Sequence, residues 1–401
     1  MTGTTADPRT TPVLVAGART PFGRCGGVFG SVSATELGAH AARAALARAG
    51  LSGEEVDAVL VGQVVQAGSG QGPARITAVA AGVGWRAPAT TVNKICLSGL
   101  TSVVDAARLV RLGEAAVVLA GGQESMSSAP HLVPRARGGV GYGNATLLDG
   151  LSDALTDSFS HLSMGEDTEG RLQRAEVGRQ EQDEVAAASH ERAAAARDAG
   201  RLAEEVVPVA VPRRRGEPAV VEHDEGVRDG TTVQVLAGLR PAFSPTGSIT
   251  AGNASPLSDG AAFVVVTSAA WAAERGVVPL ARLGAAGQVA GPDPSLLSQP
   301  AAAVRAALAR ADLQVRDLDV VEINEAFAAV VVRSCRDLGI SPEAVNTDGG
   351  AIALGHPVGA SGARLALHAA HALRRRGGGT AAVALCGGGG QGEALLLHHA
   401  G

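Results

Sequence analysis

Cys96 stands where a cysteine can act as a nucleophile. It follows the end of an expected strand and opens a helix that we expect to run to about Leu112. A thiol at a helix start lies near the positive end of the helix dipole and near free backbone N–H groups, which can lower its pKa from ~8.5 towards neutrality. The alternative is an inert buried cysteine, the commoner fate of this residue type. The position alone leaves both interpretations open.

His356 is a candidate general base. It lies between Gly355 and Pro357, inside a glycine-rich segment that reads GGAIALGHPVGASGAR over residues 349–364. Glycine allows the backbone to approach a ligand closely. A lone histidine is usually structural or solvated, whereas one held opposite a helix-start cysteine can accept its proton.

Cys386 and Asn324 each follow an expected strand. Cys386 enters a run of four glycines at 387–390, whose backbone N–H groups can bind a phosphate or an oxyanion. The run lacks the G-x-G-x-x-G spacing between a strand and a helix, so a dinucleotide site is only weakly supported. The Cys386 thiol could be an acid–base group, a redox partner or part of the packing. Asn324 ends the strand LDVVEI, where polar residues of α/β sheets commonly line sites, although an ordinary asparagine turn is the alternative.

An internal repeat predicts the elements that position these residues. The heptapeptide RAALARA occurs at 43–49 and again at 305–311, an offset of 262 residues. Further along, AAVVLAGG (115–122) is matched by AAVALCGG (381–388). Alanine-rich helices that alternate with apolar strands are typical of an α/β architecture, and a repeat of this length indicates two similar halves rather than a solenoid. By this repeat, the His356 segment occupies nearly the place in the second half that Cys96 occupies in the first.

The first half carries an insertion. Its last strand is expected at 259–268, so extra chain lies between Gly122 and Asp259. This segment contains an expected helix over roughly Gln180–Ala199 and several polar, glycine-rich stretches. Segments inserted into a rigid scaffold often carry binding function, although a decorative insertion is the alternative.

Composition argues against several classes of protein. The chain has 401 residues, of which 46% are hydrophobic and 18% charged, enough for a large core and two or three domains. The net charge of −5 and the aromatic content of 2% argue against a nucleic-acid partner and a basic membrane face. Four cysteines without a C-x-x-C pair predict neither a disulfide framework nor a zinc site. Without a visible signal peptide or membrane span, we expect a cytoplasmic protein.

Several motifs together resemble those of the thiolase family. The resemblance runs from VLVAGARTPFGR (13–24) to the C-terminal glycine loop and follows the family's order. Its most specific parts are CLSGL (96–100), GGQESMSSAPHL (121–132), LRPAF (239–243), TAGNAS (250–255), NEAFA (324–328) and GHPVGASGAR (355–364). Within the family, the chain is most similar to members that act on acetyl-CoA.

The resemblance implies the fold and its divisions. We expect an α/β protein with thiolase-like duplicated βαβαβαββ halves that form a layered α/β/α/β/α core, with an inserted loop domain. The expected divisions are a flexible tail over 1–11, an N-terminal half over 12–122 plus 247–270, a loop domain for CoA binding and oligomer contacts over 123–246, and a C-terminal half over 271–401. A homodimer or homotetramer (dimer of dimers) is also implied, with residues 123–140 contributing to tetramer contacts.

The resemblance also implies a mechanism without a permanently bound cofactor or a metal. His356 would take the proton of Cys96, whose thiolate would attack the thioester of acetyl-CoA, and Cys386 would remove a methyl proton from a second acetyl-CoA. The amides of Cys96 and Gly388 would form one oxyanion hole, and His356 with a water held by Asn324 the other. The products of this condensation are acetoacetyl-CoA and CoA. Thiolysis is the same sequence of steps in the reverse direction. The alternative is a 3-ketoacyl-CoA thiolase for longer chains in fatty-acid degradation.

Five further residues are implied as contacts of the substrate. Arg228 would lie near the nucleotide of CoA, Ser255 would contact the pantetheine, and the tunnel would be lined by Met164, Phe243 and Phe327. The chain departs from the family's usual pattern at 163–170, at 296–300 and at Asp348, none of which is a catalytic position. Reaction type is therefore easier to predict than acyl-chain length.

Overall fold

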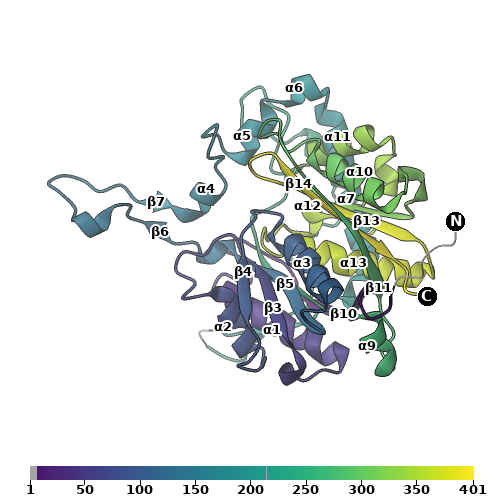
Figure 1. Ribbon diagram of the computed structural model, residues 1–401. Coiled ribbons are helices and arrows are strands. Elements are labelled where there is room, and N and C mark those ends of the chain that lie inside the picture. Colours follow the sequence, from purple (N-terminus) through teal and green to yellow (C-terminus); the bar gives the residue numbers. More distant parts are fainter. Residues whose placement is uncertain (1–6, 214) are drawn as a thin grey trace.

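The centre of the protein is one large mixed β-sheet made from both halves of the chain (Figure 1). The computed structural model describes residues 7–213 and 215–401. From edge to edge, the strands are β12 (Val320–Ile323), β13 (Thr380–Gly387), β14 (Gln391–His398), β11 (Ala281–Ala290), β1 (Pro12–Arg19), β10 (Ser258–Ser268), β5 (Val117–Ser125), β3 (Ala58–Gly62) and β4 (Ala89–Val92). The short β2 (Gly23–Arg24) pairs with β10. Strands β1 and β11 meet antiparallel where Val13 faces Arg282, and this pair joins the two halves.

Each half of the sheet has the same strand pattern. In the first half β1, β10 and β5 are antiparallel neighbours, and β3 and β4 continue in parallel. In the second half β11, β14 and β13 are antiparallel neighbours, and β12 follows in parallel. The counterpart of β4 shortens to a single bridge between Val321 and Val345. The predicted duplication is therefore confirmed.

Helices form three layers around and between these half-sheets. The first half is covered on its outer face by α1 (Ala34–Ala49) and α2 (Pro73–Ala80), and the second by α10 (Gln299–Ala311) and α11 (Ala328–Leu338). Between the half-sheets, α3 (Ser98–Leu112) packs against α13 (Ser361–Arg376) in one apolar core. The predicted α/β/α/β/α layering is confirmed.

The close approach of α3 and α13 depends on glycine. A Cβ atom on Gly99 would lie 2.6 Å from the carbonyl oxygen of Gly359, and one on Gly362 would lie 2.3 Å from the backbone nitrogen of Leu100. Both distances are far below van der Waals contact, so only glycine permits this crossing. Each helix follows a segment with a predicted site residue, Cys96 before α3 and His356 before α13, and the crossing brings these helix starts together.

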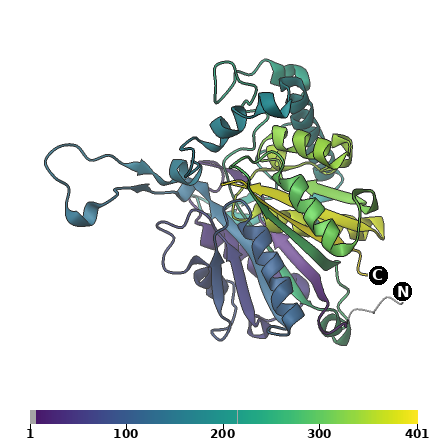
Figure 2. The ribbon, with the colours of Figure 1, turned by 45° about the horizontal axis from the view of Figure 1, so that its top comes forward.

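The insertion between β5 and β10 packs against both halves and also sends out an arm. Its helices are α4 (Gly150–Ala154), α5 (Met164–Glu169), α6 (Leu172–Ala175), α7 (Arg179–Asp198) and α8 (Val233–Ala237), and β8 (Val209–Val211) pairs with β9 (Ala219–Val221). The predicted helix at about 180–199 corresponds to α7, which packs against α11 and α12 (Ala351–Leu354). The arm, residues 131–149, starts and ends in the pair β6 (His131–Leu132) and β7 (Leu148–Asp149) and projects from the body (Figures 1 and 2).

The start of the described chain lies against α9 (Ala269–Glu274). The carbonyl oxygens of Pro8 and Thr11 accept hydrogen bonds from the backbone N–H groups of Ala270 and Ala269. The rest of the predicted tail, residues 1–6, lies outside the described residues. Within the described ranges, no helix is both long enough and apolar enough to cross a membrane.

A buried ionic network joins the insertion to both halves. The Arg19 guanidinium contacts the carboxylates of Asp224 and Glu205 at 2.6 and 2.7 Å. On the other side, His368 Nδ1 lies 3.1 Å from Glu205, and His368 Nε2 lies 3.4 Å from Asp348. Burial disfavours the charged imidazole, but Glu205 and Asp348 outweigh burial and raise the pKa of His368 to about 9. His368 is therefore an imidazolium at neutral pH.

This imidazolium predicts how stability depends on pH. The pKa of His368 lies above its unfolded value of ~6.5, so its contribution is complete below that pH and is lost as pH rises through about 9. We expect the free energy of unfolding in urea to fall between pH 6 and pH 9, and to fall less in His368→Gln. An equal fall in both proteins would show that His368 does not carry this dependence.

Candidate active site

Cys96 lies in a tight turn between β4 and α3. Ile95, just before it, has a left-handed backbone with φ 54°. The Ser98 hydroxyl holds the turn because it accepts from the Lys94 N–H at 2.8 Å and donates to the Ile95 carbonyl at 2.6 Å. Lys94 Nζ lies 3.2 Å from the buried carboxylate of Glu393 in β14, which ties the turn to the second half.

The environment of the Cys96 thiol differs from the one that we expected. The helix begins at Ser98, so Cys96 lies two residues before its first turn. Burial, with a smaller contribution from the Glu124 carboxylate, raises the pKa of Cys96 to about 12. The expectation of a lowered pKa is wrong for the protein without substrate, because desolvation outweighs the helix start. A neutral thiol of this kind needs a nearby base before it can act as a nucleophile.

His356 has the charge state that such a base requires. It lies between α12 and α13, and its backbone N–H donates to the Ser258 hydroxyl at 3.0 Å. Burial, assisted by the positive charge of Arg364, lowers the pKa of His356 to about 4. The imidazole is therefore neutral at pH 7 and can accept a proton. Gly355, directly before it, has φ 119°, a backbone conformation that favours glycine.

Asn324 lies against the His356 ring. Its backbone follows β12 and donates to the Ala384 carbonyl in β13 at 2.9 Å. Its Nδ2 atom lies 3.4 Å from His356 Nε2 and 3.5 Å from His356 Nδ1, so it contacts both nitrogens of the ring. Its Oδ1 atom is buried and makes no hydrogen bond among the described residues. A buried amide oxygen without a partner is suited to hold a polar group of a ligand or a water.

Cys386 is brought to the Cys96 turn by the hairpin of β13 and β14. Burial raises the pKa of its thiol, and nearby Cys96 raises it further. After it, Gly387 and Gly388 pack against the turn: added Cβ atoms would lie 2.7 Å from Leu97 Cγ and 3.2 Å from Ile95 Cδ1. The residues on both sides of Cys96 therefore contact the residues that follow Cys386.

A hollow of about 810 Å³ opens beside these two loops. Its lining includes Asn93 and Ile95 from the Cys96 turn, Gly388 from the hairpin and Met164 from α5. Of the predicted catalytic residues, Gly388 lines this hollow, whereas Cys96, His356, Cys386 and Asn324 do not. The sulfur of Met164 would lie 3.5 Å from a Cβ atom on Gly388, so α5 forms a wall of the site.

The other predicted contact residues divide into two groups. Phe243 and Phe327 pack edge to face with ring centroids 6.1 Å apart, in the same apolar cluster as Met164 and Cys386. Ser255 adjoins this cluster, and its hydroxyl donates to the Ala326 carbonyl at 3.0 Å. Arg228 does not line the hollow; its backbone N–H donates to His190 Nδ1 at 3.2 Å.

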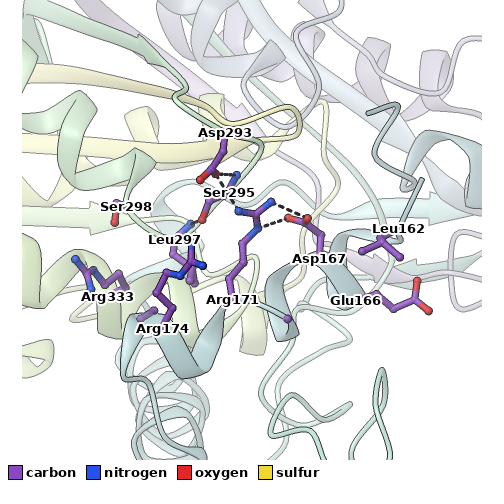
Figure 3. A pocket seen from close by; sticks show the side chains of 12 residues that line it. Leu162, Glu166, Asp167, Arg171, Arg174, Asp293, Ser295, Leu297, Ser298 and Arg333 are labelled. Carbon is purple, nitrogen blue, oxygen red and sulfur yellow. Dashed lines mark hydrogen bonds and ion pairs between the residues drawn. The ribbon is translucent and has the colours of Figure 1, made fainter. Parts of the chain in front are cut away.

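A second hollow, of about 520 Å³, lies between α5, α6 and residues 293–298 (Figure 3). Arg171, which lines this hollow, donates hydrogen bonds to Asp167 at 2.9 and 3.0 Å and to Asp293 at 3.0 Å (Figure 3). None of the predicted catalytic residues lines it. This hollow is therefore separate from the chemistry at Cys96.

Two polar residues that organise the site, Glu124 and Ser361, were not among the predicted site residues. Glu124, buried in β5, accepts from the backbone N–H groups of Val64, Val65 and Gly359, and so connects the end of β3 to the His356 loop. Ser361, the first residue of α13, places its hydroxyl 2.7 Å from His356 Nδ1. The available signal for Glu124 was a charged residue within a strand whose other side chains are uncharged. For Ser361 the signal was its spacing of five residues from the histidine.

Comparison with known proteins relates both halves of the chain to the thiolase family. Residues 12–270 match the family model described as thiolase, N-terminal domain, and residues 277–399 match thiolase, C-terminal domain. A probable acetyl-CoA acetyltransferase of Mycolicibacterium smegmatis is 54% identical over 96% of this chain and 100% of that protein. An acetyl-CoA acetyltransferase of Cupriavidus necator is 46% identical over 90% and 93%. The crystal structure of the Bacillus anthracis acetyl-CoA acetyltransferase superposes with a TM-score of 0.94 at 38% identity, covering 98% of this chain and 99% of that one.

Proposed function

The chain belongs to the thiolase family, and from that premise we propose that it is an acetyl-CoA C-acetyltransferase. It joins two molecules of acetyl-CoA into acetoacetyl-CoA and CoA, and it also catalyses the reverse thiolysis. The observation that carries this proposal is the contact between the Cys96 turn and the Cys386 hairpin, with Gly387 against Leu97 and Gly388 against Ile95. Two thiols in adjoining loops, together with a neutral imidazole that can act as a base, suit a reaction with two separate proton transfers.

In the first half of the reaction, Cys96 becomes acetylated. Neutral His356 takes the thiol proton, and the sulfur attacks the carbonyl carbon of acetyl-CoA. The C–S bond to CoA then breaks, and His356 returns the proton to the departing CoA thiolate. The raised pKa of Cys96 supports this order, because the thiol stays protonated until the base removes its proton.

In the second half, Cys386 acts on another acetyl-CoA. His356 takes the proton of the Cys386 thiol, and the Cys386 thiolate removes a proton from the methyl group. The resulting carbanion attacks the acetyl carbonyl on Cys96, which releases acetoacetyl-CoA and the Cys96 thiolate. His356 then returns its proton to the Cys96 sulfur. The amides of Cys96 and Gly388 stabilise the oxyanion on the acetyl group. His356 and a water held by the free Oδ1 of Asn324 stabilise the enolate oxygen. These side chains supply every proton transfer, so the proposed reaction uses CoA thioesters as substrates and no resident cofactor.

The packing around Cys386 supports a short acyl chain. Leu296 and Leu297 are both buried in the apolar cluster that contains Cys386, Phe327 and Phe243. Large side chains that fill this space leave little room for an extended alkyl tail. We place Ser255 at the pantetheine and Arg228 towards the nucleotide, as the family resemblance implies.

Thiolysis rates on two substrates test the chain-length proposal. We expect kcat/KM for acetoacetyl-CoA to exceed that for a medium-chain 3-ketoacyl-CoA by at least about tenfold, since each tenfold needs only ~1.4 kcal/mol of discrimination. Both rates can be followed by consumption of the 3-ketoacyl thioester at fixed CoA. A tenfold preference for the longer substrate would instead assign the chain to fatty-acid degradation.

We also propose that the chain forms a homodimer or a dimer of dimers in the cytoplasm. The arm supports the larger assembly because it projects from the body (Figure 1) and carries the exposed apolar side chains of Val140, Tyr142 and Leu147. Exposed apolar groups on a projecting segment are suited to contact another copy. The molar mass in solution distinguishes the two assemblies.

A further inference from the structure

We propose that Ser361 is a positioning residue that fixes the tautomer of His356, an inference that rests on the proposed function. The Ser361 hydroxyl oxygen lies 2.7 Å from His356 Nδ1 and 3.0 Å from the Pro357 carbonyl oxygen, four residues back along the chain. The side chains of Ser361 and His356 are both buried, so water does not compete freely for these contacts. The arrangement is a chain of three groups: imidazole, hydroxyl and carbonyl.

The Ser361 hydroxyl has one hydrogen, so it can donate to only one of its two neighbours. The arrangement that forms more hydrogen bonds is therefore favoured. A carbonyl oxygen can only accept, so the bond to Pro357 requires the Ser361 hydroxyl to donate. The hydroxyl oxygen can then accept from an N–H at His356 Nδ1, and both contacts become hydrogen bonds. If the hydroxyl instead donated its hydrogen to Nδ1, its contact with the Pro357 carbonyl would no longer be a hydrogen bond. The first arrangement makes two bonds and the second makes one.

Which nitrogen carries the proton determines what His356 can do. Its pKa of about 4 means that the ring is neutral at pH 7, with one protonated nitrogen. A proton on Nδ1 leaves a lone pair on Nε2, which Asn324 Nδ2 contacts at 3.4 Å and which the proposed function uses to accept the proton of Cys96. When Nε2 accepts that proton, the Nδ1–H bond to Ser361 remains and stabilises the imidazolium. A proton on Nε2 would make the base inactive towards the thiol.

The repeat shows that this role belongs to only one half of the fold. Ser98 begins α3 as Ser361 begins α13, and each is followed by the glycine at which the two helices cross. The Ser98 hydroxyl, however, bonds only to backbone groups, those of Lys94 and Ile95. The same helix-start serine therefore shapes the nucleophile's turn in one half and orients the base in the other.

Ser361→Ala tests the inference against a matched control. Ser102→Ala removes another fully buried hydroxyl that donates to a carbonyl four residues back, at 3.0 Å, but does not touch His356. We expect Ser361→Ala to slow acetylation of Cys96 by about 10- to 100-fold with little change in KM. We expect Ser102→Ala to stay within about twofold of the unaltered chain, and Ser361→Thr to recover part of the rate.

Nitrogen NMR of histidine labelled with ¹⁵N gives a readout that a merely structural role would not change. The resonances of His356 can be assigned by their loss in His356→Gln. They should show Nδ1 protonated in the unaltered chain. In Ser361→Ala they should show a mixture of the Nδ1 and Nε2 tautomers. Protonation at Nε2 in the unaltered chain would overturn the inference, as would an acetylation rate in Ser361→Ala equal to that of Ser102→Ala. If the unaltered chain is not acetylated at all, the proposed function fails instead.

Discussion

Cys96→Ala is expected to lower turnover by at least about a thousandfold without unfolding the protein. The variant removes the sulfur that carries the acetyl group between the two half-reactions of the proposed mechanism, and loss of a catalytic nucleophile usually costs this much or more. Alanine is smaller than cysteine and the site opens to a hollow, so we expect the fold to accept the change. The assay is acetoacetyl-CoA thiolysis, with circular dichroism as a check of folding.

Two other cysteines provide controls for this prediction. Cys25 is exposed, and Cys335 is buried in the core between α10, α11 and the second half-sheet. Alanine at either position should leave turnover within a factor of about three, because neither thiol lies in the site. Undiminished turnover in Cys96→Ala, or an equal loss in Cys25→Ala, would contradict the role of Cys96.

Cys386→Ala is expected to have a similarly large effect on turnover but to stop the reaction at a different step. Without this thiol, no group removes the methyl proton of the second acetyl-CoA, so condensation should fall by at least about a thousandfold. The first half-reaction needs Cys96 and His356 only. Mixing the variant with acetyl-CoA should therefore release close to one equivalent of CoA per chain and then stop.

Deuterium exchange separates the two steps further. The unaltered chain should exchange the methyl protons of acetyl-CoA in deuterated water, and Cys386→Ala should not. His356→Gln is the comparison, because it should prevent the initial release of CoA. Steady turnover or normal methyl exchange in Cys386→Ala would refute the assignment of Cys386 as the second base.

Much of the fold and the main site residues could be predicted because they leave local signals. The repeated RAALARA helices and the paired AAVVLAGG and AAVALCGG strands indicate the two halves, and the structure confirms the duplication. Cys96, His356 and Cys386 stand next to glycine-rich turns at the ends of strands or the starts of helices. Such positions are recognisable from the sequence because backbone conformation there depends on residue type.

The energetics of the site could not be predicted in the same way. The pKa of Cys96 depends on burial by chain segments distant in the sequence and on Glu124, whereas the sequence shows only the neighbouring helix. Likewise, Asp348 departs from the family pattern without a visible partner in the sequence. In the structure it pairs with Arg201 and Arg375 at 2.8 Å and faces His368, within a network that only the tertiary fold assembles.

The site of acetylation tests the central claim most directly, that the fold joins Cys96 to a base and a second thiol in one reaction centre. The unaltered chain would be exposed briefly to acetyl-CoA, quenched in acid, digested and analysed by mass spectrometry. We expect one acetyl group per chain, confined to Cys96, with Cys25, Cys335 and Cys386 free. Acetylation that is absent, or that resides on Cys386 rather than Cys96, would contradict it.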